Sequence, residues 1–306
     1  MKLSCKLLAV ALIGLTAGAA AQAQTTLRYK FKEGEKLEYV VDQDQKIAMS
    51  VLGMDIDMTS KMAMELSCQT LKVDEKGSAQ FKVTLSRVKM TMEGGPLGKV
   101  EVDSKDTEEP DNPFGKMFFD MVKGIGGLEM TFTADNAGTL SDVKLTEGKK
   151  MKKLPGGGFG VGGNAFGPDA LKSLVEGTVI IPLPKDPIEK GKTWKQKVDT
   201  KTELGKIAGE NTFTYEGPEK NNLEKLSIKP DMKIDADPNA PIQLKMKSGK
   251  GKGYTLFDNH AGRIAQSNSE ATIEMEIEAM GNTIAVNTTQ TTIMRLKGGK
   301  KSEQEK

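Results

Sequence analysis

Apolar and polar residues alternate with a period of two along most of this chain. The clearest stretch runs from residue 54 to residue 68, where odd positions are mostly polar and Ala63 is the exception. Its even positions are apolar or small: Met54, Ile56, Met58, Ser60, Met62, Met64, Leu66 and Cys68. A β-strand places alternate residues on opposite faces, whereas a helix would spread this pattern around its circumference. At ~3.3 Å per residue the run extends about 50 Å, which predicts a coiled sheet or a curved half-barrel.

Turn residues and breaks in the alternation predict how the strands connect. Residues 47–51 alternate up to Leu52-Gly53, where a tight turn would pair them with the long strand. The parity slips between Leu85 and Val88, which predicts a β-bulge near Ser86-Arg87. A second clear hairpin turns at Gly281-Asn282. Further strands are expected at 27–31, 81–92, 128–134, 178–181, 193–202, 211–215, 223–234, 242–246 and 253–257.

Helix signals are few and short. Residues 113–123 predict one helix, with Asn112 as its cap and Pro113 at the first helical position. Residues 168–175 predict a second. We interpret both as apolar plugs that close an end of the sheet. The predicted fold is therefore mostly β, with two related antiparallel halves of long curved strands, half-barrel or sandwich-like, and one or two short helices.

The N-terminus has the features of a secretory signal peptide. Lys2 and Lys6 precede an apolar stretch at 7–15, and Ala21-Gln22-Ala23 is a small-x-small cleavage site. We expect cleavage between Ala23 and Gln24, a periplasmic or extracellular location, and no transmembrane segment after processing, because no apolar run reaches about 18 residues. The expected organisation is a signal peptide (1–23), an N-terminal β half (24–147), a basic glycine-rich linker (148–167), a C-terminal β half (168–297) and a disordered charged tail (298–306).

Several turn and strand features occur in both halves. Each half has a Gly/Glu/Lys turn before a strand, at 33–36 and 189–192, and an Asp-Asn turn ending in glycine, at 135–138 and 258–262. Each half also has a long hairpin, 47–66 or 273–296, early in the first half and late in the second. These features fit either an ancestral duplication that is not collinear throughout or repeated use of the same turn chemistry. Their order after a signal peptide resembles exported bacterial β-rich families of unknown function. The resemblance implies export and a β fold, and it carries no catalytic residue.

Net charge and cysteine content limit which binding partners and which disulfide bonds are expected. Removal of residues 1–23 takes away Lys2 and Lys6 and no acidic residue, so the 44 basic and 42 acidic residues of the whole chain become balanced. A formally neutral chain has no net field that would attract nucleic acid or an anionic membrane. Processing also leaves Cys68 as the single cysteine, without an intrachain disulfide partner. We interpret it as a small buried apolar residue, with interchain pairing or reactivity as the alternative.

Signatures of catalysis and of cofactor binding are weak. The single histidine, His260, lies beside Asp258 in a turn, and no Gly-x-Ser-x-Gly motif supplies a nucleophile. Residues 158–163 match G-x-G-x-x-G but lack the preceding strand and following helix of a dinucleotide site. Acidic stretches at 103–111 and 235–239 could bind Ca²⁺ through oxygen ligands, but they lack EF-hand spacing and fit solvated loops better. We expect no catalytic residue, no cofactor and no bound metal.

Methionine is the most informative residue type for function, with 17 in the chain. The expected inner surface of the first sheet carries seven: Met54, Met58, Met62, Met64, Met90, Met92 and Met130. These thioethers could fill a core, or they could line an adaptable cavity for an apolar ligand, because methionine suits promiscuous binding surfaces. The predicted function is a non-enzymatic binding or envelope-structural protein. The alternatives are a carrier of a lipid or hydrophobic peptide in a Met-lined concavity and a hydrolase with dispersed carboxylates.

Overall fold

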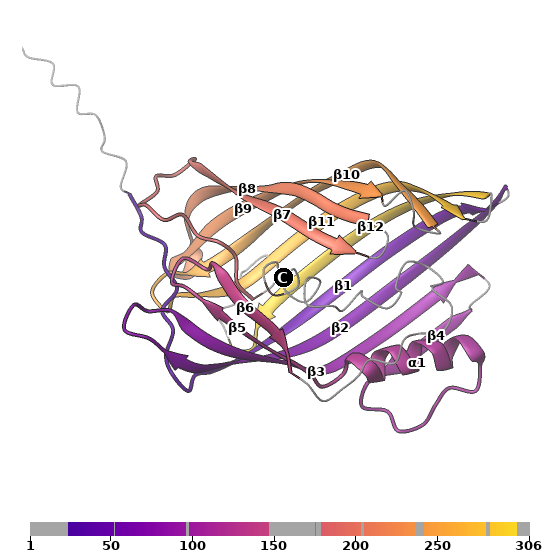
Figure 1. The fold of residues 1–306 in the computed structure, drawn as a ribbon, viewed down its shortest axis with the longest axis horizontal. Helices are drawn as coiled ribbons and strands as arrows, with labels where there is room; N and C mark the ends of the chain where they lie inside the picture. The colour runs from indigo at the N-terminus through magenta and orange to yellow at the C-terminus, as the bar shows by residue number, and fades with distance from the viewer. Residues whose placement is uncertain are drawn as a thin grey trace, which may run out of the picture.

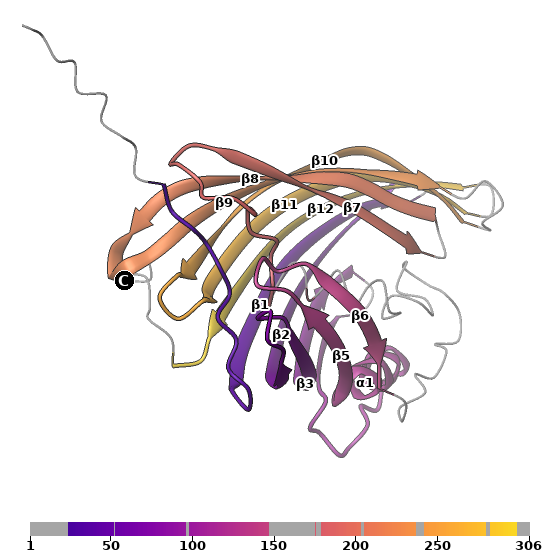
Figure 2. The same ribbon diagram turned by 60° about the vertical axis from the view of Figure 1, so that its left-hand side comes forward.

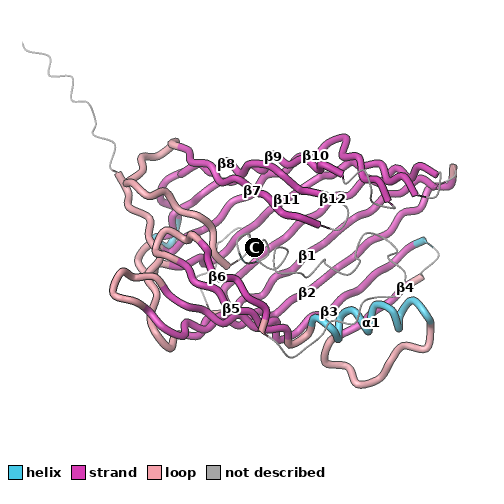
Figure 3. Tube along the Cα trace, viewed as in Figure 1, coloured by secondary structure: helices cyan, strands magenta, loops and turns pink. Residues whose placement is uncertain are grey.

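A single curved antiparallel sheet dominates the molecule. A computed structural model of the chain describes residues 24–51, 53–95, 98–146, 175, 179–202, 205–236, 242–279 and 282–298. Within these ranges twelve strands form one open sheet in the order β6-β5-β3-β2-β1-β12-β11-β10-β9-β8-β7, with β4 paired to β3 (Figure 1). The sheet is curved, so it has a concave inner face and a convex outer face (Figure 2). The predicted fold class, mostly β with long curved antiparallel strands and few helices, is confirmed (Figure 3).

The strand lengths follow the alternation of the sequence. In the N-terminal half the strands are β1 (Lys36–Val51), β2 (Met54–Val73), β3 (Ala79–Gly94), β4 (Lys99–Asp103), β5 (Leu128–Ala134) and β6 (Leu140–Leu145). In the C-terminal half they are β7 (Thr193–Thr202), β8 (Gly205–Glu219), β9 (Leu223–Ala236), β10 (Ile242–Asp258), β11 (Arg263–Ala279) and β12 (Asn282–Leu296). The helices are α1 (Pro113–Ile125) and the 3₁₀ turn η3 (Lys220–Asn222).

The two halves are joined in the middle of the sheet. β1 pairs on one side with β2 and on the other with β12, with Ile47 opposite both Met58 and Thr288. The two long hairpins, β1–β2 and β11–β12, are therefore neighbours in one continuous ladder. This part of the sheet is therefore built from both halves of the chain.

The predicted hairpin and bulge are both confirmed. β1 ends at Val51 and β2 begins at Met54, and Gly53 has a φ of 80°, in the left-handed region that a tight turn requires. In the β2–β3 ladder Glu65 faces Arg87 and the next pair joins residues 66 and 85, so Ser86 is the extra residue. The Ser86 hydroxyl donates a hydrogen bond to the Glu65 carbonyl (3.0 Å), which holds the bulge in place.

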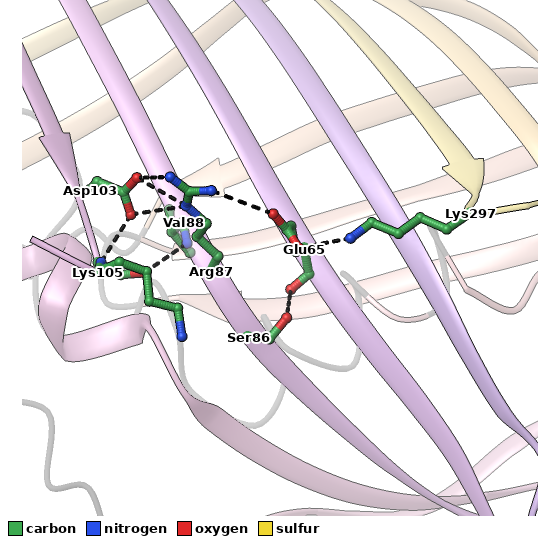
Figure 4. Close-up of polar contacts among 8 residues, drawn as sticks. Glu65, Ser86, Arg87, Val88, Asp103, Lys105 and Lys297 are labelled. Carbon is green, nitrogen blue, oxygen red and sulfur yellow. Dashed lines mark hydrogen bonds and ion pairs between the residues drawn. The ribbon is translucent and has the colours of Figure 1, made fainter.

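Ion pairs link strands across the outer, convex face near this bulge. Arg87 donates to Asp103 at the end of β4, with Nη2 2.6 Å from Oδ2, and Glu65 of β2 contacts Lys297 just beyond β12 at 2.8 Å (Figure 4). Asp103 is buried, and its Oδ1 also accepts from the Lys105 backbone at 2.9 Å. These contacts join β3 to β4, and β2 to the end of the last strand.

Helix α1 forms as the sequence predicts. The Asn112 side chain accepts a hydrogen bond from Gly115 N at 2.6 Å, and Pro113 occupies the first helical position. Its apolar side, including Phe119, Val122 and Ile125, is buried in the main core and lies beside β3 and β4. The second predicted helix, 168–175, lies outside the described residues except for Val175, which is buried.

One end of the trough is closed by chain that lies outside the ladders. Segment 25–31 crosses this end, where Tyr29 N donates to Asn136 O and Lys30 N donates to Gly262 O. The predicted strand at 27–31 is therefore wrong, because its backbone N–H groups donate to two turns. Thr25, which precedes it, forms an isolated bridge with Ile188. The predicted strand at 178–181 is also wrong, because residues 179–183 form an irregular, mostly buried segment that lies against segment 25–31. We call this end the closed end.

The closed end holds the main hydrophobic core. Leu27 and Tyr29 from the crossing segment pack with Phe81, Phe132, Phe213 and other buried side chains from both halves. The ring pairs Phe31–Phe81 and Phe81–Phe132, at 4.9 and 5.1 Å between centroids, continue this packing across β3 and β5. The opposite end, where the β1–β2 and β11–β12 hairpins turn, is called the open end.

Candidate functional site

The candidate site lies on the inner, concave face of the sheet. This face is defined by Tyr39 and Val41 of β1, both buried in the main core. Their partners on the same face are Leu66 and Met64 of β2 and Leu296 and Met294 of β12. Because side chains alternate between faces, the inner face of β1 continues toward the open end through its odd-numbered residues.

The seven methionines singled out in the sequence all lie on this inner face, but their surroundings differ. Met64, Met90 and Met130 belong to the main core, and Met62 and Met92 pack against it. Met58 is buried without belonging to that core, and Met54, beside the hairpin turn, is 62% exposed. Five of the seven are thus core or core-flanking residues. The remaining two lie toward the open end.

The open end of the inner face carries a larger apolar surface that sequence reasoning missed. We call it the apolar patch: Ile47, Met49, Ile56, Met58, Leu244, Met246, Ile273, Met275, Ile277, Ile284 and Val286. Direct cross-strand pairs such as Met275–Met246 and Met275–Val286 make it continuous from β2 to β10. Most of these side chains are partly exposed, and none belongs to the main core. The alternation at 273–277 was visible in the sequence, but only the β1–β12 pairing brings it beside Met49 and Met58.

Between the core and the apolar patch lies a band of uncharged polar side chains. We call it the polar belt: Gln43, Gln45, Ser60, Ser269, Thr288, Gln290 and Thr292. The register places Gln45 between Ser60 and Gln290, and Gln43 beside Thr292. Gln290 Nε2 donates to Thr292 Oγ1 at 3.0 Å. The inner face therefore changes from apolar to polar and back to apolar along the strands.

The inner face of the four central strands carries no carboxylate side chain. None of the inward positions of β1, β2, β11 and β12 is Asp or Glu, whereas their outward positions carry Asp42, Glu65, Glu274 and Glu276. Several outer acids are paired, such as Glu276 with Lys247 at 2.8 Å. Across the described ranges no group of three or more His, Cys, Asp or Glu residues is placed to hold a metal ion.

The other candidates from the sequence lie away from the inner face or outside the described chain. His260 is exposed in the β10–β11 turn, and its carbonyl accepts from Lys30 Nζ at 3.2 Å. Asp103, in the first acidic stretch, is held by Arg87, whose guanidinium lowers the pKa of that carboxyl. Residues 158–163 and most of 235–239 lie outside the described ranges, as does Ala23. Gln24 donates to Glu189 Oε1 at 3.3 Å.

Cys68 is buried at the closed end. Burial raises the pKa of its thiol from 9.0 to about 12, so the thiol stays protonated at neutral pH and is a poor nucleophile. It lines a cavity of about 30 Å³ with Tyr29, Glu35, Tyr39 and Arg263. This space is large enough for water and too small for an organic ligand.

Comparisons with known proteins leave the function open. No family model and no curated protein matches the chain. Lipovitellin, in a structure concerned with lipid–protein interactions, is similar at 11% identity and a TM-score of 0.48 over 90% of this chain, which spans only 26% of that one. DynF from the dynemicin biosynthesis pathway of Micromonospora chersina is similar at 10% identity and a TM-score of 0.25, covering 99% of this chain and 96% of that one.

An outer membrane channel from Pseudomonas putida F1 is also similar, at 8% identity and a TM-score of 0.26, covering 87% of this chain and 96% of that one. These three TM-scores lie below 0.5, so function has to be argued from the residues of this chain. In the described part of the chain, no helix has the length and apolar character needed to cross a bilayer.

Proposed function

We propose that this protein is an exported, non-enzymatic carrier that holds a lipid acyl chain against the apolar patch. The supporting observation is that Ile, Leu, Met and Val side chains from five neighbouring strands form one partly exposed surface on the concave inner face of an open sheet. Soluble proteins rarely leave large contiguous apolar surfaces unoccupied, and such surfaces mark binding sites.

The composition of the patch suits an acyl chain. Unbranched thioether side chains such as Met49, Met58 and Met275 adapt to chains of different shape and need no hydrogen-bond partner from the ligand. Across the five strands from β2 to β10, at ~4.8 Å between neighbouring strands, the patch extends roughly 19 Å. That length exceeds the ~15 Å depth of one bilayer leaflet's hydrocarbon. The patch is therefore long enough for a membrane lipid's acyl chain.

At the closed end, chain segments outside the sheet cover the core and block access to the inner face from that side. Segments 25–31 and 179–188 cover the core there, and Tyr215 fastens the first of them through a 3.0 Å hydrogen bond to Thr25. An acyl chain would therefore enter from the open end or across an edge of the sheet. The signal-like residues 1–23 support an exported carrier, and N-terminal sequencing of the mature protein should begin at Gln24.

A pair of double variants tests the proposal. Met275→Gln with Val286→Thr makes one directly opposed pair of the patch polar. Glu274→Gln with Asn287→Thr changes the adjacent opposed pair on the outer face and is the matched control. Removing about 50 Å² of apolar contact should weaken binding of an uncharged fluorescent acyl probe about tenfold in the first variant and leave the control unchanged.

The native ligand is sought by organic extraction of the purified protein and mass spectrometry. Co-purified lipid would support the carrier. The proposal is abandoned if no lipid is extracted and the wild-type protein fails to bind an uncharged fluorescent acyl probe.

A further inference from the structure

The polar belt contains hydroxyl groups on largely buried residues that form no hydrogen bond within the described chain. Ser60 and Thr288 are each only 9% exposed. Within the described ranges neither side chain has a hydrogen-bond partner, and the same holds for the amides of Gln43 and Gln45. Neither hydroxyl oxygen is among the buried side-chain atoms left without a partner in the described chain, so both still reach solvent and are available to a ligand. The belt is thus supplied with donors and acceptors beyond those that the fold uses.

These groups face one place on the inner surface. Gln45 lies directly opposite Ser60 on β2 and Gln290 on β12. Thr288 precedes Gln290 by two residues and is on the same face of β12. Ser269, on the next strand, faces Thr292 and is exposed, so solvent reaches the belt on that side. Beyond it, β10 has glycines at the inward positions, and the belt ends there.

Apolar side chains of β9 explain why the polar belt ends at β10. A Cβ on Gly251 would lie 2.6 Å from Pro230 Cγ, and a Cβ on Gly253 would lie 2.8 Å from Ile228 Cγ2. Pro230 and Ile228 of β9 therefore lie close over the glycines and bound the belt with apolar atoms. The polar belt is therefore confined to β1, β2, β11 and β12.

The chemistry of the belt indicates what it would recognise. Amides and hydroxyls both donate and accept, and the belt includes no Lys, Arg, His, Asp or Glu. A carboxylate or phosphate group would be expected to meet a cation, since charge-assisted bonds are the strong ones for anions. An uncharged carbonyl or hydroxyl needs only neutral partners such as these.

We infer that the polar belt binds the uncharged ester, amide or hydroxyl group of a neutral acyl lipid whose hydrocarbon chain lies on the apolar patch. This inference rests on the proposed carrier function and adds the class of its ligand. The lipid's polar group would lie toward the core, and its chain would extend from Gln45 toward the open end. Neutral lipid is thereby favoured over free fatty acid, whose carboxylate would be desolvated without a cation.

Competition binding with two ligands of equal chain length tests this inference. 1-Oleoylglycerol and oleate, at pH 8, displace a fluorescent acyl probe from the wild-type protein. One to two hydrogen bonds gained in place of a desolvated charge should favour 1-oleoylglycerol by about tenfold. Ser60→Ala with Thr288→Val should remove this preference while the acyl probe still binds.

Thr289→Val is the matched control for the belt variant. Thr289 is the next residue on β12, faces outward and is exposed, so the preference should persist in this variant. The belt variant should also keep its stability, because its two hydroxyls have no partner in the described chain. Equal binding of the two ligands by the wild-type protein, or a preference that survives in the belt variant, would overturn the inference alone. Failure of the acyl probe to bind wild-type protein would overturn the carrier function as well.

Discussion

Tyr29 and Ile181 exchange two hydrogen bonds through one hydroxyl group. The Tyr29 hydroxyl donates to the Ile181 carbonyl at 3.1 Å and accepts from the Ile181 N–H at 2.9 Å. The Tyr29 ring stacks on Phe31 and meets the edge of Phe257 on β10. This residue therefore ties the two irregular segments of the closed end to each other and to the sheet. Both segments are buried there, so water is poorly placed to replace these bonds.

Replacing Tyr29 by Phe should lower the free energy of unfolding by about 1–3 kcal/mol, because it leaves a buried donor and acceptor of Ile181 unpaired. Tyr39→Phe is the matched control: Tyr39 is equally buried, but in the described structure its hydroxyl forms no hydrogen bond and lines the small cavity. Urea unfolding measures both variants. Equal losses in the two would show that the Tyr29–Ile181 bonds contribute little.

Stability should fall as the pH rises above about 9, because unfolding releases groups whose pKa values are raised by burial. The Cys68 thiol has a pKa of about 12 in the folded protein against 9.0 normally, and burial also raises the pKa of Tyr29 and Tyr39. Between these values the unfolded state has lost protons that the folded state retains, so stability decreases with pH.

Cys68 alone should account for a loss of about 1.4 kcal/mol between pH 8 and pH 10. Urea titrations of wild type and Cys68→Ala across this range separate the thiol from the tyrosines. The Ala variant starts from lower stability because of its cavity, and it should lose less on going to pH 10. Parallel pH curves for the two proteins would contradict this assignment.

The sequence predicts features that depend on neighbouring residues better than features that depend on distant ones. The turn at Gly53, the bulge at Ser86 and the cap at Asn112 are local, and all three were predictable from spacing and turn chemistry. The segment at 27–31 alternates like a strand, but its backbone bonds go to turns more than a hundred residues away. The local alternation of apolar and polar residues does not predict such distant hydrogen-bond partners.

Strand β10 and the apolar patch also depend on pairing with distant residues, which local sequence does not predict. Residues 242–246 and 253–257 were predicted as separate strands, and Gly249 and Gly251 lie between them. They form one strand because β9 and β11 pair along both sides and the glycines relieve contact with β9 side chains. The patch likewise needs the β1–β12 register, which unites residues about 240 positions apart and is not encoded in any local period.

Asp103→Asn should destabilise the folded protein by about 1–3 kcal/mol at pH 7, because Asp103 is buried and accepts charge-assisted bonds from Arg87 as well as the Lys105 N–H. The Arg87 hydrogen bond lowers the pKa of Asp103 in the folded state. Its stabilising effect is therefore present above the unfolded pKa and is lost as the pH falls through the folded value.

Thermal unfolding between pH 2 and pH 7 checks this prediction. The Asp103→Asn variant should show a flatter acid limb than wild type. Glu101→Gln is the control, because Glu101, on the same strand as Asp103, makes an exposed pair with Lys89 of β3 and should change stability little. If Glu101→Gln flattened the acid limb as strongly as Asp103→Asn, buried charge pairing would not be the cause.

Gly262→Ala should be more damaging than Gly191→Ala, although both glycines have positive φ values, 67° and 83°. Left-handed backbone alone costs about 1–2 kcal/mol for alanine, and Gly191 has open space for a Cβ. A Cβ on Gly262 would overlap Lys30 N, the group that donates a 3.1 Å hydrogen bond to the Gly262 carbonyl. The substitution must therefore push segment 25–31 away from the β10–β11 turn. We expect at least twice the loss of unfolding free energy for Gly262→Ala, together with faster tryptic cleavage after Arg28 and Lys30. Equal stability and equal cleavage in the two variants would mean that this turn does not hold the segment at the closed end.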